Sequence, residues 1–211
     1  MKKIVILLTF FLIPLPSAQA QLIKGYGFKA GIAITNQDFN SIMGVDFDFK
    51  NRFGFDFGGY IEWFDLRFFS MLTEAHYVQK GMIHELTITS FPQPYLEETV
   101  KLNNRVDYLS FPILAKMTYQ TDKISPYFFV GPRFDFLLDY RSEWHLWDQI
   151  YRKFKDVDIG LDVGIGTEVK FTSKLTILAE FRFSPDVTYA YKTKALKVKN
   201  NSFEILTGAR F

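Results

Sequence analysis

The stretch DVDIGLDVGIGTEVK, residues 156–170, alternates apolar and polar residues with a period of two. One face carries the apolar set Val157, Ile159, Leu161, Val163, Ile165 and Val169. The other face carries Asp158, Gly160, Asp162, Gly164, Gly166 and Glu168. This alternation predicts a β-strand with one apolar and one polar face. In a soluble barrel or sandwich the apolar face forms the core, whereas in a membrane barrel it faces lipid.

The first 20 residues, MKKIVILLTFFLIPLPSAQA, have the pattern of a secretory signal peptide. Lys2 and Lys3 precede an apolar run, which ends in the small-residue sequence AQA, typical of a cleavage site. The run is short and contains two prolines, so it is a poor candidate for a membrane-spanning helix. We therefore expect residues 1–20 to be removed and residues 21–211 to form a single domain.

Charge and cysteine content limit the class of protein further. The sequence has 25 Lys and Arg and 23 Asp and Glu, and loss of Lys2 and Lys3 would leave 23 of each. A neutral chain has no overall field that attracts nucleic acid, so no nucleic-acid partner is expected. The chain has no cysteine and therefore no disulfides. No later apolar run reaches the roughly 20 residues of a membrane helix, so the mature chain could cross a membrane only as a closed barrel.

Seven further segments repeat the alternation, which predicts about eight strands, an even number as in single-chain bacterial barrels. They are residues 26–35, 54–64, 66–81, 107–119, 127–140, 175–183 and 203–211. Short connections near residues 65, 120–125 and 171–174 alternate with long ones at 36–53, 82–103, 141–155 and 185–199. The first long connection either holds its own hairpin or extends the second strand, because Val45, Phe47 and Phe49 alternate with aspartates. Short periplasmic turns and long extracellular loops are typical of an outer-membrane barrel.

The polar faces favour lipid on the outside. Glycines among the acids of residues 156–170 would make room for long side chains across a narrow lumen, and Trp63, Tyr119, Tyr127 and Tyr140 near strand ends suggest interfacial girdles. Opposite charges on these faces could pair when buried. The expected lumenal charge network consists of Lys29, Glu62, Glu74, His76, Lys116, Arg133, Asp135, Asp158, Asp162, Glu168, Glu180, Arg182, Glu204 and Arg210. The alternative, a secreted lipocalin-like barrel, would have to hold too much aromatic bulk inside.

Several motifs resemble the small outer-membrane β-barrel family of Bacteroidetes, labelled porin-like or PorT-like. They are GFKAGIAIT at residues 27–35, LTEAHYVQKG at 72–81, DYLSFPILAKM at 107–117 and YFFVGPRFDFLL at 127–138, together with the terminal Phe211. The resemblance implies an outer-membrane barrel in a Gram-negative cell. The segment before residue 27 is shorter than in the secretion-linked PorT proteins. The resemblance therefore supports a role in secretion less strongly than it supports the barrel fold.

Catalytic chemistry has one candidate group. Ser70, Glu74 and His76 share a face and could suggest acyl transfer by a lipid-modifying enzyme. Successive residues on one face of a strand lie about 6.5 to 7 Å apart, which is too far for a direct relay. The three histidines lack the spacing of a metal site, and GIGTEV lacks the third glycine of a dinucleotide motif. We therefore expect no catalytic, cofactor or metal site.

The long loops carry the remaining functional signal. Trp144, Trp147, Tyr151 and Phe154 lie among charges in residues 143–154, a composition enriched at binding interfaces. The alternative is that these aromatics rest on lipid headgroups. The sequence thus predicts a non-enzymatic outer-membrane barrel with a structural or surface-interaction role. Its expected partners are lipopolysaccharide and a surface protein or polymer, and the alternatives are a lipid-modifying enzyme, a small-solute channel or a secretion component.

Overall fold

The stretch that decides the fold forms strand β6 (Val157–Lys170) in the computed structural model. Its apolar side chains point outward: Ile165 is 65% exposed and Val163 is 41% exposed. Asp158 and Asp162, on the other face, are both 0% exposed. The polar face of this strand is therefore the inner face, as expected for a barrel with lipid outside.

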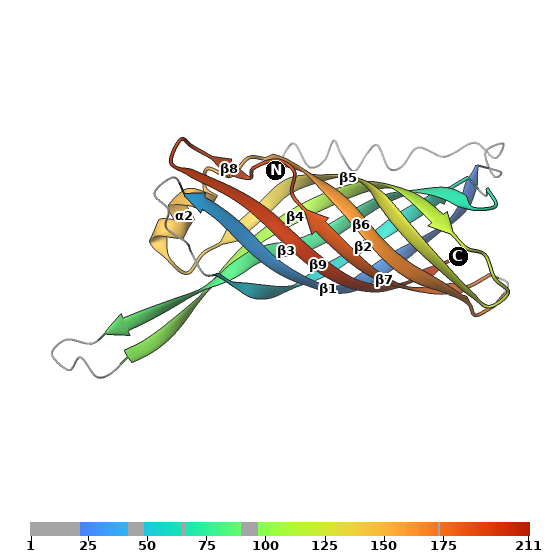
Figure 1. The fold of residues 1–211 in the computed structure, drawn as a ribbon, viewed down its shortest axis with the longest axis horizontal. Helices are drawn as coiled ribbons and strands as arrows, with labels where there is room; N and C mark the ends of the chain where they lie inside the picture. Colours follow the sequence, from blue (N-terminus) through green and yellow to red (C-terminus); the bar gives the residue numbers. More distant parts are fainter. Residues whose placement is uncertain (1–21, 42–48, 65, 90–96, 173) are drawn as a thin grey trace.

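The structure describes residues 22–41, 49–64, 66–89, 97–172 and 174–211 (Figure 1). Besides β6, its strands are β1 (Ile23–Ser41), β2 (Phe49–Trp63), β3 (Phe69–Thr89), β4 (Glu97–Thr118), β5 (Ile124–Arg141), β7 (Thr176–Pro185), β8 (Tyr191–Lys192) and β9 (Leu196–Arg210). The helix α2 (His145–Tyr151) lies between β5 and β6. Within these ranges no helix is long and apolar enough to cross a membrane. The expected signal peptide, residues 1–20, lies outside the described residues.

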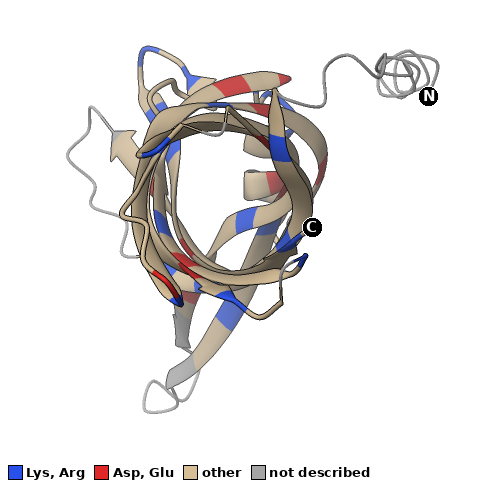
Figure 2. Ribbon diagram, turned by 90° about the vertical axis from the view of Figure 1, so that its right-hand side faces the viewer, with Lys and Arg blue, Asp and Glu red and all other residues tan. Residues whose placement is uncertain are grey.

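Eight of the described strands close into one antiparallel ring (Figure 2). Strands β1 to β7 pair with their neighbours in sequence, and β9 pairs with both β7 and β1. The closing β1–β9 register runs from Gly27↔Arg210 to Ser41↔Leu196, so the ring has no free edge. The two-residue strand β8 pairs with β9 beside the ring. The predicted all-β, up-and-down barrel of eight strands is confirmed.

The two ends of the barrel differ in their connections. Short turns after β2, β4 and β6 define what we call the turn end, and longer connections define the loop end (Figure 1). Two of the long loops are shorter in the structure than the sequence predicts. β3 and β4 remain paired as far as Thr89↔Glu97, so the predicted loop 82–103 is largely a projecting hairpin. The reason is that this hairpin extends past the lipid-facing wall, where pairing persists without a strict apolar face.

The first predicted loop is also mostly strand. β1 continues to Ser41 and β2 begins at Phe49, which leaves only residues 42–48 between them. Those residues lie outside the described part, so the choice between a separate hairpin and a longer second strand rests on the strand bounds alone. Both strands are extended into the predicted loop, because β1 ends at Ser41 rather than near residue 35 and β2 begins at Phe49 rather than near residue 54.

The glycines of β6 explain how the narrow ring accommodates large side chains. Gly160, Gly164 and Gly166 are the register partners of Arg133, Phe129 and Tyr127 on β5. A Cβ atom on Gly164 would lie 2.4 Å from the Phe129 ring, and one on Gly160 would lie 2.3 Å from Arg133 Nη2. The glycines thus provide the space that the long side chains of the neighbouring strand occupy.

The outer wall is apolar, and two of the four aromatic residues expected in girdles, Tyr127 and Tyr140, lie on the inner side instead. Tyr140 is partly buried and packs against Tyr151 of α2, with ring centroids 6.2 Å apart. Tyr119 is 69% exposed at the turn end, as expected for an interfacial residue. Tyr127 is only 5% exposed and points into the lumen, because its neighbours Pro126 and Phe128 take the outward positions. Tyr127 is therefore part of the barrel interior and not of a girdle.

Candidate functional site: the lumen and its loop-end mouth

Inward-facing side chains fill the barrel in successive layers. From the turn end these are a charged cluster, an apolar layer, two further charged clusters and an aromatic cluster at the mouth. Each strand contributes every second residue, since side chains on a strand point to opposite faces in turn. The lumen is therefore built from residues that are far apart in sequence.

The turn-end cluster joins side chains from five strands: Lys24, Glu62, Lys116, Glu168 and Arg210. Glu62 Oε1 lies 3.1 Å from Lys116 Nζ and 3.3 Å from Lys24 Nζ. Glu168 Oε1 lies 2.7 Å from Arg210 Nη1 and also pairs with Lys116. Each buried carboxylate of this cluster meets two or more cations, which offsets its loss of hydration.

An apolar layer separates this cluster from the next. It consists of Tyr60, Leu72, Leu114, Tyr127, Phe129 and Leu178, all buried. The Lys116 ammonium lies 4.4 Å from the centroid of the Tyr127 ring, on the turn-end side. On the opposite side, the Lys29 ammonium lies 4.8 Å from the centroid of the Tyr60 ring. The layer thus packs directly against cations on both sides, an arrangement that cation–π attraction stabilises.

The central cluster is organised around Arg182 on β7. Its guanidinium lies within 4 Å of the carboxylates of Glu74 (2.8 Å), Asp162 (3.2 Å), Glu180 (3.3 Å) and Glu204 (3.8 Å). Lys29 Nζ lies 2.5 Å from Glu74 and 2.8 Å from Glu180. Two cations therefore hold together carboxylates from four strands.

The loop-end cluster is organised around Arg133 on β5. Arg133 pairs with Asp135 at 2.9 Å, with Asp162 at 2.7 Å and with Asp186 at 2.6 Å. Lys80 Nζ lies 2.6 Å from Asp135 and 3.5 Å from Asp186. Because Asp162 pairs with both Arg133 and Arg182, the loop-end and central clusters form one continuous network.

The structure places all fourteen side chains expected in the lumen on the inner face, although they do not form one uniform network. Asp158 has no cation within 4 Å in the described part of the chain, and accepts a hydrogen bond from Tyr108 Oη at 3.4 Å. Sequence reasoning missed Lys80 and Asp186. Both could have been found by counting on in steps of two, from His76 and from Arg182.

The charged lumen is closed to water at these levels. Lys29, Lys80, Arg133 and Arg182 are only 1–2% exposed, although they belong to the residue types that are least often buried. A continuous column of water beside them would leave these long side chains accessible. Their burial therefore indicates that side chains fill the cross-section of the lumen.

His76 does not form the relay considered from the sequence. Ser70 Oγ donates to Glu62 at 2.6 Å in the turn-end cluster, whereas His76 Nδ1 lies 2.6 Å from Asp56. Ser110 is the cross-strand partner of His76, so a serine, a histidine and an aspartate are neighbours. All three are 1% exposed among ion pairs. A substrate carbonyl would have to displace this packing to reach the serine.

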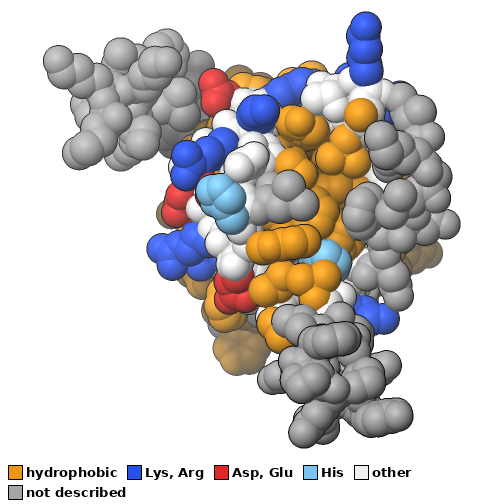
Figure 3. Space-filling model, turned by 90° about the vertical axis from the view of Figure 1, so that its left-hand side faces the viewer, with side chains coloured by type: hydrophobic (Ala, Val, Ile, Leu, Met, Phe, Trp, Pro, Cys, Tyr) orange, Lys and Arg blue, Asp and Glu red, His pale blue; other side chains and the backbone are white. Residues whose placement is uncertain are grey.

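The mouth at the loop end is closed by aromatic side chains from α2 and the residues after it. Trp147, Tyr151 and Phe154 are buried, and pack with Phe49, Met82, Val106, Tyr108, Ala190 and Val198 in a cluster that we call the mouth cluster. Trp147 and Phe49 have ring centroids 5.6 Å apart, and Tyr151 and Phe154 have centroids 4.8 Å apart. Figure 3 views this end and shows hydrophobic side chains gathered at its centre.

Hydrogen bonds connect the mouth cluster to the loop-end cluster, which lies deeper in the lumen. Tyr151 Oη donates to Gln37 Oε1 at 2.6 Å, and Gln37 Nε2 donates to Asn200 Oδ1 at 2.8 Å. Asn200 Nδ2 then donates to Asp186 at 2.8 Å. Burial raises the pKa of Tyr151, so its hydroxyl stays protonated and able to donate. The position of α2 is thus coupled to the loop-end cluster.

This placement corrects the interpretation of the loop aromatics as surface contact residues. Of the four candidates, Trp147, Tyr151 and Phe154 are 0–6% exposed, and Trp144 alone is accessible at 36%. The physical reason is that α2 turns its apolar face inward over the mouth, where burial of large aromatic side chains is favourable.

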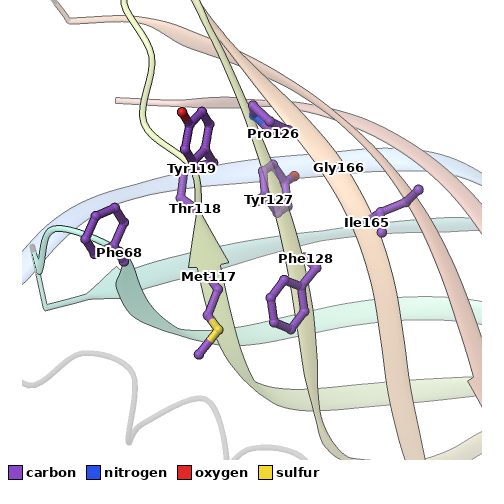
Figure 4. A pocket seen from close by; sticks show the side chains of 9 residues that line it. All are labelled: Phe68, Met117, Thr118, Tyr119, Pro126, Tyr127, Phe128, Ile165 and Gly166. Carbon is purple, nitrogen blue, oxygen red and sulfur yellow. The ribbon is translucent and has the colours of Figure 1, made fainter.

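The outer wall has an apolar groove near the turn end, with a volume of about 520 Å³ (Figure 4). It is lined by Phe68, Met117, Thr118, Tyr119, Pro126, Tyr127, Phe128, Ile165 and Gly166. The lining has no carboxylate, histidine or amine and therefore offers no acid–base chemistry. Among the described residues, no group of three or more histidine and acidic side chains is arranged to hold a metal ion.

Comparison with known proteins gives a family match. Residues 19–191 match the family described as outer membrane protein beta-barrel domain. No curated protein matches the sequence.

Several solved structures are similar to this chain. Neisserial surface protein A has 15% identity, covers 88% of this chain and 95% of its own, and has a TM-score of 0.46. Ail, the attachment invasion locus protein of Yersinia pestis, has 16% identity, covers 89% and 98%, and has a TM-score of 0.42. The outer membrane protein OprG of Pseudomonas aeruginosa has 12% identity, covers 92% and 98%, and has a TM-score of 0.48.

Proposed function

Because the chain belongs to the family of outer membrane protein beta-barrel domains, we propose that it is a non-enzymatic outer-membrane protein with a closed lumen. In this proposal the turn end faces the periplasm and the loop end faces the outside, as in other outer-membrane barrels. Residues 1–20 are the export signal that is removed. The role is structural or surface-interacting, carried by the loop-end segments.

The observation that carries the proposal is the burial of the lumenal charges. Arg182 is 1% exposed and within 4 Å of four carboxylates. An ion network of this kind resists opening, since separating one partner leaves an uncompensated buried charge. The mouth cluster adds a second, apolar closure above it. A small-solute channel would need both closures to open.

The proposed role at the cell surface rests on the projecting parts of the loop end. The β3–β4 hairpin extends beyond the ring, and Trp144 is the exposed aromatic of the α2 segment. A surface protein or polymer is the proposed partner of these parts, and lipopolysaccharide is the proposed neighbour of the wall. The Bacteroidetes and PorT-like affinity, with any link to secretion, is likewise a proposal drawn from the sequence motifs.

Cell fractionation tests the location. The mature chain, without residues 1–20, is expected in the outer-membrane fraction and should run at different positions on a gel before and after boiling. Its N-terminal sequence gives the cleavage site. Recovery of a detergent-free, soluble periplasmic monomer would contradict the proposal and favour a lipocalin-like barrel.

The Asp56–His76 pair opposite Ser110 is the observation that favours a lipid-modifying enzyme. If these residues only fill the lumen, His76→Ala lowers stability and leaves the acyl pattern of lipid A unchanged. Mass spectrometry of lipid A from cells with the wild-type or variant protein measures this. A changed acyl pattern in the variant, with equal amounts of folded barrel, would establish the enzyme instead.

A further inference from the structure

A group of lysines surrounds one tyrosine on the outside of the barrel at the loop end. The ammonium groups of Lys192, Lys197 and Lys199 lie 5.6, 5.6 and 4.8 Å from the centroid of the Tyr189 ring. They belong to the β8–β9 hairpin and the segment just before it. We call these four residues the lysine cluster.

The lysine cluster lacks internal charge compensation. Within the described residues no carboxylate lies within 4 Å of its three ammonium groups. The acid nearest in register is Asp38, opposite Lys199 on β1, and Asp38 instead accepts a hydrogen bond from Asn201 at 2.5 Å. The aromatic ring attracts the ammonium groups without neutralising them. The cluster thus holds three positive charges together, and among the described residues none of the three forms an ion pair within 4 Å.

The position of the cluster relates it to the lipid-facing wall. On β9, Val198, Asn200 and Ser202 are buried inside the barrel, so the alternate positions Lys197 and Lys199 share the outward face with Phe203 and Ile205. Phe203 and Ile205 are 45% and 47% exposed. Lys199 is four residues beyond Phe203, about 13 Å along the strand and less along the membrane normal because barrel strands tilt.

The apolar column below the cluster is continuous across two strands. Phe203 stacks on Phe183 with ring centroids 4.7 Å apart, and on Phe181 with centroids 6.1 Å apart. Such a column fits acyl chains, and the lysines begin where the column ends. Headgroup phosphates of the same lipid would lie at that level.

We propose that the lysine cluster binds the phosphate groups of phosphorylated lipid A in the outer leaflet, with its acyl chains along Phe181, Phe183 and Phe203. The proposal deepens the proposed function and rests on it, because it requires the loop end to face outward. A phosphate carries close to two negative charges and several acceptor oxygens. Three adjacent ammonium groups provide the matching donors, and lysine binds phosphate as a point charge.

The test measures lipid binding by the full mature chain in detergent by native mass spectrometry. The probes are bis-phosphorylated lipid A and the same lipid A after enzymatic dephosphorylation. The variant is Lys192→Gln/Lys197→Gln/Lys199→Gln, and the matched control is Lys123→Gln/Lys170→Gln/Lys174→Gln, which removes three exposed lysines at the turn end. At about 1 kcal/mol per lysine, loss of all three lysines should lower the affinity of the first variant for the phosphorylated lipid roughly a hundredfold.

The wild-type and control proteins should prefer the phosphorylated lipid, and the cluster variant should bind both lipids equally weakly. An unchanged preference in the cluster variant, or an equal loss in the control, would overturn the proposal. Complete competition by soluble polyphosphate at the same phosphate concentration would overturn it in favour of a surface polymer. Gel mobility before boiling checks that each variant is folded. Absence from the outer membrane would refute the proposed function, whereas a correctly located barrel without lipid preference refutes this inference alone.

Discussion

The central lumen and the mouth are both closed, but by opposite chemistry. In the central cluster, Arg182 and Lys29 hold carboxylates from several strands in ion pairs. At the mouth, Trp147, Tyr151 and Phe154 from a connection between strands close the opening by apolar packing. The ring strands fix the first closure directly, whereas the second depends on where a short helix lies on top of the ring.

The difference predicts how each closure fails. Loss of a central cation leaves charges buried in place, because the strands that carry them cannot move apart without breaking the ring. Loss of a mouth aromatic can be relieved by movement of the connection alone, since α2 is only seven residues long and is held by its aromatic packing and by side-chain hydrogen bonds such as Tyr151–Gln37. The central cluster should therefore be coupled to global stability and the mouth to local opening.

Arg182→Met should have the largest effect. The substitution keeps much of the side-chain volume but leaves Glu74 and Glu180 dependent on Lys29, so we expect a loss of about 3–5 kcal/mol in the free energy of unfolding. Urea titration in lipid vesicles, followed by gel mobility without boiling, measures it. Arg152→Met is the control, since its pair with Asp148 is exposed and such pairs contribute about 0–1 kcal/mol. Equal stability of the two variants would show that the central network is not critical.

Trp147→Ala should have a smaller and local effect. Truncation of a buried tryptophan costs about 3 kcal/mol, but release of α2 from the mouth avoids part of that cost. Hydrogen exchange measured by mass spectrometry should rise in residues 145–155 and stay unchanged in β6 and β7. Trp144→Ala, at the exposed neighbouring aromatic, is the matched control. Faster exchange throughout the ring would contradict the separation of the two closures.

Gly164→Val should have the smallest effect of the three. A Cβ atom at this position would lie 2.4 Å from the Phe129 ring and 2.5 Å from the carbonyl oxygen of Phe181. Overpacking of this kind costs about 1–3 kcal/mol, which the same urea titration can measure. Gly59→Ala is the control, because its Cβ would have no neighbour nearer than 3.6 Å. If both variants unfold at the wild-type urea concentration, the glycines are not required to accommodate the β5 side chains.

The sequence was sufficient to predict the ring because every strand within the lipid-facing wall must bury one face and expose the other. Because of that constraint, the period-two pattern of residues 156–170 predicts a strand of the ring. The same alternation assigns Arg133, Arg182 and Glu74 to the lumen. The same counting would have found Lys80 and Asp186. The pairing partners could not be predicted, because they depend on the register between strands: His76 pairs with Asp56 on β2, not with Ser70 on its own strand.

Beyond the lipid-facing wall, a strand does not have to expose an apolar face to lipid. The sequence therefore predicts the structure of these parts less well. The β3–β4 hairpin continues well into the predicted loop, since strand pairing there has no lipid-facing face to reveal it. Helix α2 is too short to show a helical period. The aromatic content of residues 143–154 was visible in the sequence, but a cluster of tryptophan and tyrosine is equally compatible with a partner, with lipid headgroups and with the barrel mouth. Only the fold identifies the mouth for Trp147, Tyr151 and Phe154.

Single-channel recording in a planar bilayer tests the central claim, a closed lumen, most directly. The purified wild-type barrel should show no steady porin-sized conductance, because the buried ion pairs and the apolar layer of Tyr60, Leu72 and Phe129 block the cross-section. Trp147→Ala should also remain closed, since it opens only the upper of the two closures. Reproducible large, open-channel steps from the wild-type protein would contradict the account.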